Sequence, residues 1–186
     1  MKENSTIQSI LARRSVRSYS QKEVSREDMD TILNCGIHAP TAWHREPWAI
    51  RAIQDRETLR QFDLDCLEWI KKAQPSAAGL FSGESASVFY HAPALVIVSG
   101  DRSSPFATID CSLVGENLMI AANALGIGSC AIGFAAEFLK SSDGNPWKKK
   151  FKIADNFESV IAIIFGHATS ATSSGSNRDA SKIIYI

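Results

Sequence analysis

Two uninterrupted apolar stretches constrain the fold of this chain more than any other feature. Residues 92–100 read APALVIVSG, and residues 159–166 read SVIAIIFG. A continuous apolar run of this length is expected of a strand that is covered on both faces, because a half-exposed strand alternates apolar and polar residues. The stretch 92–100 therefore predicts a strand covered on both faces, and 159–166 is the strongest strand prediction in the chain.

The spacing of apolar residues predicts the other elements. Helices are expected near the N-terminus, from Ser25 onward, over 56–73 and over 108–128. Strands are expected at 48–53 and 129–132, a polar helix or turn at 145–151, loops at 74–87 and 167–177, and an extended tail at 181–186. Helices and strands do not alternate regularly, which favours an α+β sandwich over a doubly wound parallel sheet. No repeat or linker divides the chain, so residues 1–186 are predicted to form a single domain.

Capping residues and apolar stripes refine these helices. Ser5 is a candidate cap of the first helix, and Ser25 with Asp28 resembles a capping box at the start of the second. The second helix should end before Pro40, because the residue preceding proline avoids helical angles. The apolar stripe of 56–73 is Leu59, Phe62, Cys66 and Ile70. A central, buried position is predicted for the helix 108–128 from Ile109, Leu113, Leu118, Ala121 and Leu125.

Composition excludes several classes of protein. The chain has 20 Lys and Arg against 20 Asp and Glu, so it lacks the excess positive charge of a general nucleic-acid binder. No apolar run is long enough for a membrane span, and the N-terminus does not resemble a signal peptide. The four cysteines form no CxxC pair and are expected to be reduced and mostly buried. We therefore expect a cytoplasmic protein that binds neither membrane nor nucleic acid.

Common catalytic motifs do not occur. The sequence contains no GxGxxG, GxxxxGK[ST], HExxH or GxSxG motif, and its four histidines lack metal-ligand spacing, so no metal site is predicted. Nothing supports a Cys–His nucleophile. His38 and His91 each precede an Ala-Pro pair and are expected to be ordinary packing residues.

The segment RRSVRSYS, residues 13–20, concentrates Arg13, Arg14 and Arg17 around Ser15. In one interpretation these cations simply end a short helix, where positive charge is favourable. In the other, two guanidinium groups and a hydroxyl converge on one phosphate. The segment by itself does not decide between the two.

Four motifs together resemble the nitroreductase family of FMN-dependent oxidoreductases. The first is RRSVRSY at 13–19, and the second is APTAWHREPW at 39–48, bounded by two prolines. The third is DCSLVGENLMIAANALGIGSC followed by AIGF, residues 110–134, and the last is NRDASKIIYI at the C-terminus. Their order agrees with the family over nearly the whole chain. Thr41, His44 and Glu46 depart from the Ser, Asn and Gln that are usual in that family.

The resemblance implies a fold and a set of site residues. The fold would be a three-layer sandwich with a mixed, mainly antiparallel central sheet flanked by helices, in an intertwined homodimer. Arg13, Arg14, Ser15 and Arg178 would hold the phosphate of a tightly bound FMN, and Arg17 would reach the flavin ring as an electrostatic stabiliser. The backbone at Ile132 and Gly133 would face the flavin N5. The other subunit would contribute Pro40, Thr41, Ala42 and His44 to a site shared between chains.

The activity implied by the resemblance is a ping-pong reaction. NADH or NADPH would pass a hydride to flavin N5, and a nitroaromatic, quinone or similar small-molecule acceptor would then receive it. No side-chain acid or base is required for that step, in agreement with the missing catalytic motifs. Two alternatives stay open: a specialised flavoenzyme of the same family, of oxidase or dehalogenase type, and a flavin-binding carrier or sensor without turnover.

Overall fold

The computed structural model describes residues 3–83, 85–170 and 178–186 of the chain. Its centre is a four-stranded sheet in the order β1-β2-β4-β3, and each neighbouring pair is antiparallel. The two long apolar stretches are strands, as predicted, and they form the central pair of the sheet. The strands are β1 (Trp48–Ile53), β2 (Ala94–Asp101), β3 (Gly128–Ala131) and β4 (Phe157–Gly166).

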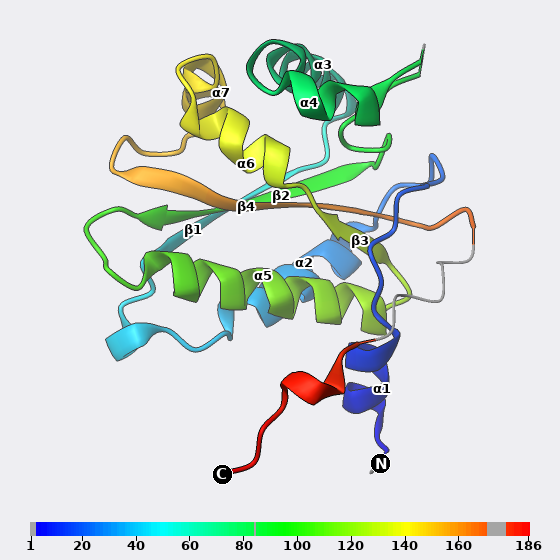
Figure 1. Cartoon of the computed structure of the whole chain (residues 1–186), viewed down its shortest axis with the longest axis vertical. Coiled ribbons are helices and arrows are strands. Elements are labelled where there is room, and N and C mark those ends of the chain that lie inside the picture. The colour runs from blue at the N-terminus through cyan, green and yellow to red at the C-terminus, as the bar shows by residue number, and fades with distance from the viewer. Residues whose placement is uncertain (1–2, 84, 171–177) are drawn as a thin grey trace.

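Helices cover both faces of the sheet and make three layers (Figure 1). On one face lie α2 (Arg26–Ile37) and α5 (Ala107–Ala124). On the other lie α3 (Arg56–Ala73), α6 (Gly133–Lys140) and α7 (Asn145–Lys150). The short α1 (Ser5–Ala12) contacts α5 and extends below that layer. The α+β class predicted from the sequence is confirmed.

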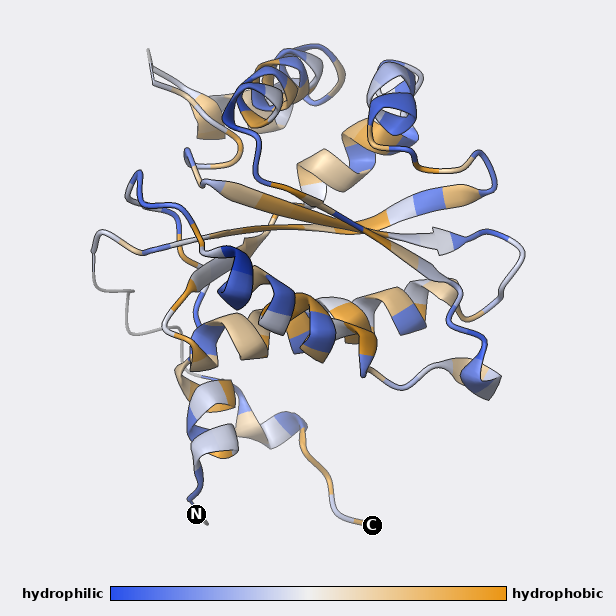
Figure 2. Ribbon diagram, turned by 180° about the vertical axis from the view of Figure 1, so that it is seen from behind, coloured by the Kyte–Doolittle hydropathy of each residue, from blue (hydrophilic) through white to orange (hydrophobic). Residues whose placement is uncertain are grey.

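The central strands separate two apolar cores. In β2, Leu95 and Ile97 face the core beneath α3, α6 and α7, whereas Val96 and Val98 face the core beneath α2 and α5. Every one of these side chains is fully buried. Burial on both faces explains why the strand lacks the alternation of an exposed sheet. The hydropathy colouring shows the same apolar band through the sheet (Figure 2).

One glycine allows α2 and α5 to pack closely. A Cβ atom at Gly36 would lie 2.5 Å from Cδ2 of Leu118 on α5.

The predicted N-terminal cap of α2 is confirmed, because the Ser25 side chain accepts a hydrogen bond from the Asp28 N–H. The helix ends at Ile37, before Pro40, also as predicted.

Several local predictions need correction. Asn4, not Ser5, caps α1, because its side chain accepts a hydrogen bond from the Ile7 N–H. The segment 74–87 is not simply a loop: it holds α4 (Pro75–Ala78) and the 3-10 turn η2 (Gly79–Phe81). Helix α6 was not predicted at all, since only its first residues had been interpreted, as part of a turn motif.

The apolar stripe predicted for α5 is only partly buried. Leu118 is buried as expected, but Ile109, Leu113 and Leu125 are exposed. The face that packs on the sheet carries small and β-branched residues instead, including Cys111, Val114 and Ala122. The prediction assumed that every apolar residue of this helix faces the core of its own chain.

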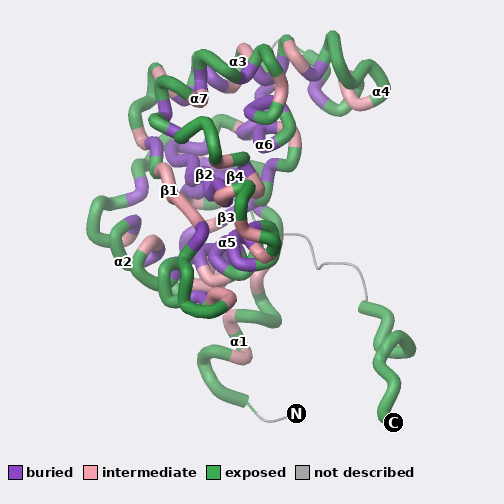
Figure 3. The backbone as a smooth tube through the Cα atoms, turned by 90° about the vertical axis from the view of Figure 1, so that its left-hand side faces the viewer, coloured by how far each residue is buried: buried purple, intermediate pink, exposed green. Residues whose placement is uncertain are grey.

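The C-terminal segment 178–186 stands away from the rest of the chain (Figure 3). It contains the 3-10 turn η3 (Ala180–Lys182), so the tail predicted as extended is extended only beyond Lys182. All its described residues are exposed, including the apolar Ile183, Ile184 and Ile186. Of the predicted loop 167–177, residues 171–177 lie outside the described residues.

Candidate functional site

The arginine-rich segment is attached to the edge strand β3. The Val16 N–H donates to the Ser129 carbonyl at 2.9 Å, and Ser15 forms an isolated parallel bridge with Ser129. Gly128 makes this approach possible, because a Cβ there would lie 2.7 Å from a Val16 methyl group. The buried Tyr19 hydroxyl donates to the Val16 carbonyl at 2.7 Å. The backbone from Ser15 to Tyr19 is therefore held in place within one chain.

The first two arginines make different contacts. Arg13 lies 3.8 Å from the Glu116 carboxylate on α5, a distance at which attraction is weak. Arg14 donates from Nη1 to the Leu11 carbonyl at 2.7 Å and to the Arg13 carbonyl at 2.8 Å. Arg14 thus satisfies carbonyls at the end of α1, which is the helix-terminus interpretation of the cluster. A guanidinium group has five N–H donors, so these bonds leave Arg14 able to hold an anion as well.

Arg17 lines a cavity of about 310 Å³. Across it lie Phe81, Ser87, Tyr90 and His91. Burial raises the pKa of the neighbouring Tyr19 far above its usual value, although the charge of Arg17 acts in the opposite direction. Burial likewise raises the pKa of the Cys130 thiol, opposed by Arg17. The positive charge of Arg17 thus acts on both Tyr19 and Cys130.

The junction of β3 and α6 presents open backbone. The Ile132 N–H is used, since it donates to the Ala162 carbonyl at 2.8 Å. Gly133 begins α6, and a Cβ atom built on it would meet no other atom within 4 Å. The Ser129 hydroxyl is buried and has no hydrogen-bond partner among the described residues. An unpartnered hydroxyl thus lies on the strand that carries the arginine segment, and uncovered backbone directly follows that strand at the start of α6.

The proline-bounded segment lies at the other end of α5. The Ala42 N–H donates to both carboxylate oxygens of Asp110, at 3.3 Å each. Trp43, His44 and Glu46 all have left-handed backbone, with φ near 50°. Such strain in residues with bulky side chains persists only where surrounding contacts impose it, and it concentrates at functional sites. The segment therefore presents an exposed, fixed shape.

One chain does not bring the predicted residues together. Helix α5 has 18 residues, about 27 Å of helix, and it separates the arginine segment at one end from Pro40, Thr41, Ala42 and His44 at the other (Figure 1). Arg178 lies in the C-terminal segment, which stands away from the rest of the chain, and it is exposed. The segment that carries Arg13, Arg14, Ser15 and Arg17 is bridged to Ser129 of β3, and Ile132 and Gly133 directly follow that strand.

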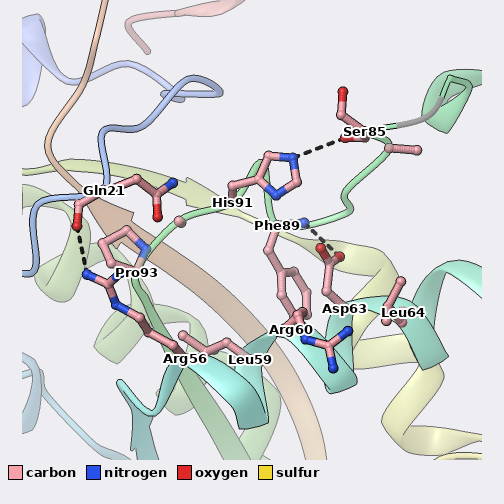
Figure 4. A pocket seen from close by; sticks show the side chains of 12 residues that line it. Gln21, Arg56, Leu59, Arg60, Asp63, Leu64, Ser85, Phe89, His91 and Pro93 are labelled. Carbon is pink, nitrogen blue, oxygen red and sulfur yellow. Dashed lines mark hydrogen bonds between the residues drawn. The ribbon is translucent and has the colours of Figure 1, made fainter.

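A larger cavity contains none of the predicted residues. It has a volume of about 420 Å³ and is lined by Arg56, Leu59, Asp63 and Phe89, with Gln21 and His91 at its rim (Figure 4). His38 and His91 are both exposed, so the prediction that they are ordinary packing residues is wrong. His91 also lines both cavities. Sequence reasoning also missed Asp63 and Asp110. The only signal for them in the sequence was that each acidic residue lies next to an apolar residue of a predicted helix.

The remaining polar groups do not suggest another centre. Cys66, Cys111 and Cys130 are buried and Cys35 is exposed, as the sequence largely predicted. Within residues 3–83, 85–170 and 178–186, no three His, Cys, Asp or Glu side chains are placed to hold a metal ion. No helix in that described part is long and apolar enough to cross a membrane.

A three-layer α+β fold with a cation-bearing segment on an edge strand defines the structural class of this protein. Residues 10–167 match the profile of the nitroreductase family, and the chain belongs to that family. A relative from Archaeoglobus fulgidus, provisionally named NADH dehydrogenase/NAD(P)H nitroreductase, is 33% identical over 67% of this chain. An FMN reductase (NADPH) from Bacillus subtilis is 28% identical over 70% of this chain.

Solved structures share the fold along the whole chain. A nitroreductase with bound FMN from Bacteroides fragilis superposes with a TM-score of 0.91 at 27% identity, covering 99% of this chain and 100% of its own. A second, from Desulfitobacterium hafniense, has the same TM-score at 22% identity, which shows the fold alone. The matches cover 64% of the A. fulgidus relative and 54% of the B. subtilis enzyme, so this chain spans less than two thirds of their lengths.

Proposed function

We propose that this protein is an FMN-dependent oxidoreductase that uses NADH or NADPH and reduces a nitroaromatic, quinone or similar small acceptor. The observation that carries the proposal is the arginine segment held on β3 beside the uncovered backbone of Gly133. Family membership supports it, as do the FMN in the B. fragilis structure and the reductase names of the relatives. The chemistry that FMN supplies when bound is hydride transfer from a nicotinamide to the acceptor.

The residues present fit a flavin mononucleotide. A phosphate requires concentrated cations and hydrogen-bond donors, and Arg13, Arg14 and Ser15 supply both on one short segment. A flat ring requires backbone that it can approach closely, and the bare Cα of Gly133 faces open space. The unpartnered Ser129 hydroxyl adds a buried donor on the same strand. The first two observations match different parts of the cofactor, the phosphate and the ring.

The proposed roles divide along the segment. Arg13, Arg14 and Ser15 bind the phosphate, and Arg178 joins them from the C-terminal segment. Arg17 lines the adjacent cavity and offers its charge to the ring, where a positive charge favours an anionic form. The backbone at Ile132 and Gly133 orients the ring edge. Since the Ile132 N–H is already bonded to Ala162, the Gly133 N–H is the better donor.

We further propose that the site is completed by a second copy of the chain. Ala42 is bonded to Asp110 in the first turn of α5, whereas β3 follows the last turn of that helix. The fixed backbone of Pro40, Thr41, Ala42 and His44 therefore suits contact with another chain. Exposed apolar side chains are available to form the interface, including Ile109 and Leu113 on α5 and Ile184 in the C-terminal segment. His44 offers ring nitrogens to a flavin carbonyl or N3 in place of the usual Asn.

The experiment is anaerobic flavin reduction. The purified protein should be yellow and release FMN on denaturation, and NADH or NADPH should bleach its visible absorbance. Reoxidation with a panel of nitroaromatics and quinones then identifies the acceptor class. A colourless protein that does not take up FMN would disprove the proposal, and an FMN complex that no nicotinamide bleaches would favour a carrier or a specialised flavoenzyme.

Arg17→Ala sharpens the test of the site. This variant should retain FMN, lower the reduction potential of the bound flavin and slow its reduction by NAD(P)H. Arg26→Ala is the matched control, because Arg26 is an exposed arginine on α2 that pairs only with Asp30 in the described structure. Equal potentials and rates in the Arg17 variant and the control would remove Arg17 from the site.

A further inference from the structure

Asp63 of α3 connects this helix to the segment that follows α4 and η2. Its carboxyl accepts hydrogen bonds from the Ser87 hydroxyl, the Val88 N–H at 2.7 Å and the Phe89 N–H at 3.2 Å. Figure 4 shows the carboxyl turned toward the backbone of Phe89. Three donors on one carboxyl fix three consecutive residues relative to α3.

Ser87 passes this support further along the chain. Its Oγ donates to Asp63 and accepts from the His91 N–H at 3.0 Å. Tyr90 and His91 have left-handed backbone, with φ of 51° and 57°. Residues with side chains adopt this conformation only when neighbouring contacts compensate for the strain. Asp63 and Ser87 therefore support a turn that the sequence SVFYHAP would not hold unaided.

The supported segment separates the two cavities, and we call residues 85–91 the partition. Ser85, Ala86 and His91 line both cavities, whereas Tyr90 lines only the one that contains Arg17. Val88 and Phe89 are buried in the core and anchor its middle. Tyr90 is partly buried against the core beneath α3 and borders one cavity, whereas the exposed His91 borders both. Polar contacts therefore act together with packing to determine where Tyr90 and His91 lie.

We propose that Asp63 is a positioning residue for the cofactor site: by holding the partition through Ser87, it sets the wall of the cavity that contains Arg17. This inference rests on the proposed FMN function. Asp63 itself does not line that cavity, and it acts on a bound ligand only through Ser87, Tyr90 and His91. Removing its carboxyl frees the partition to move into the larger cavity behind it.

The same helix offers a matched control. Asp65 is also partly buried on α3, and its carboxyl accepts a hydrogen bond from Nε1 of Trp147 at 2.9 Å. That bond fixes α7, which carries no residue of either cavity. Asp65→Ala removes a carboxyl of the same helix and one tertiary hydrogen bond, against three for Asp63→Ala, without touching the partition.

The experiment compares Asp63→Ala, Asp63→Asn, Ser87→Ala and Asp65→Ala by hydrogen exchange and by FMN titration. Asp63→Ala should speed amide exchange in peptides covering 85–91 at least tenfold and weaken FMN binding at least fivefold. Asp63→Asn keeps an oxygen acceptor for the Val88 and Phe89 N–H groups, so it should restore most of both properties. Asp65→Ala should change neither, even if its melting temperature falls equally.

Each result bears on the inference. Equal FMN affinity in Asp63→Ala and Asp65→Ala would overturn it, as would unchanged exchange in the partition. If Asp63→Ala does not fold, Ser87→Ala decides, because it removes only the hydroxyl that links Asp63 to His91. If the wild-type protein binds no FMN, the proposed function fails and this positioning role with it, whereas hydrogen exchange still reports whether Asp63 holds the partition.

Discussion

The segments at the two ends of α5 are built in different ways. At one end, residues 13–19 are part of the sheet edge, bonded through Val16 to Ser129 and closed by the Tyr19 hydroxyl. At the other end, residues 40–46 are held mainly by two contacts. The Ala42 N–H donates to the Asp110 carboxylate, and the ring of Trp43 packs against that of Phe106 with 5.1 Å between the ring centroids.

The difference shows which half of the proposed site a single chain prepares. The backbone of the arginine segment is held on β3 within one chain, so the Cα positions of its cations are set without a second chain. The proline-bounded segment carries its shape in strained backbone and exposes Trp43, which is 66% accessible. A surface of that kind is suited to completing the site of a neighbouring molecule rather than its own.

Mixing two impaired variants would test this comparison most strongly. Arg17→Ala removes a residue of the first segment, and His44→Ala removes one of the second. If each site combines both segments from different subunits, mixed dimers contain one site with both changes and one site with neither. Unfolding and refolding an equal mixture should then restore about a quarter of the wild-type sites.

Activity per site after mixing is the measurement, with each variant refolded alone as the control. No recovery, although mixed dimers are detected by native mass spectrometry, would show that both segments serve the same chain.

The phosphate role of the first segment predicts the next largest effect. Arg13→Ala should weaken FMN binding about 10- to 100-fold, because a hydrogen bond to a charged group contributes about 1.5–3 kcal/mol. Arg14→Ala should weaken it less, since two of its bonds go to carbonyls at the end of α1. Fluorescence titration of FMN measures both. The reverse order would assign the phosphate to Arg14.

Asp110 tests how the second segment is held. Asp110→Ala should lower the free energy of unfolding by about 1 kcal/mol, because the Ala42 N–H loses its acceptor and the first turn of α5 loses a favourable negative charge. Urea denaturation measures the change. Thr108→Ala, an exposed neighbour on α5, should stay within about 0.5 kcal/mol of wild type. Equal stability of the two variants would argue against this anchor.

Cysteine labelling gives the smallest effect and compares the two regions directly. Cys130 lies buried behind the arginine segment, whereas Cys35 is exposed at the end of α2, before the proline-bounded segment. Burial raises the pKa of Cys111 to about 12 and also raises that of Cys66 and Cys130. One thiol per native chain should therefore react rapidly with a thiol reagent at pH 8, and the Cys35→Ser variant should show none.

Much of the secondary structure could be predicted because each signal is local. The runs at 92–100 and 159–166 became β2 and β4, since a strand buried on both faces must be apolar throughout. The stripe Leu59, Phe62, Cys66 and Ile70 is buried on α3 as its helical spacing required. Helix α6 was not predicted, because the sequence AIGF at its beginning was interpreted only as part of a motif.

The sequence by itself determined which residues are chemically able to bind an anion and which strands are buried, because charge, hydropathy and spacing are properties of neighbours along the chain. Only the tertiary structure decided that Asp63 supports a distant turn, that Ile109 and Leu113 face outward, and that α5 separates the two segments of the proposed site. These outcomes depend on which elements pack together and at what angle, and a periodic pattern contains no such information.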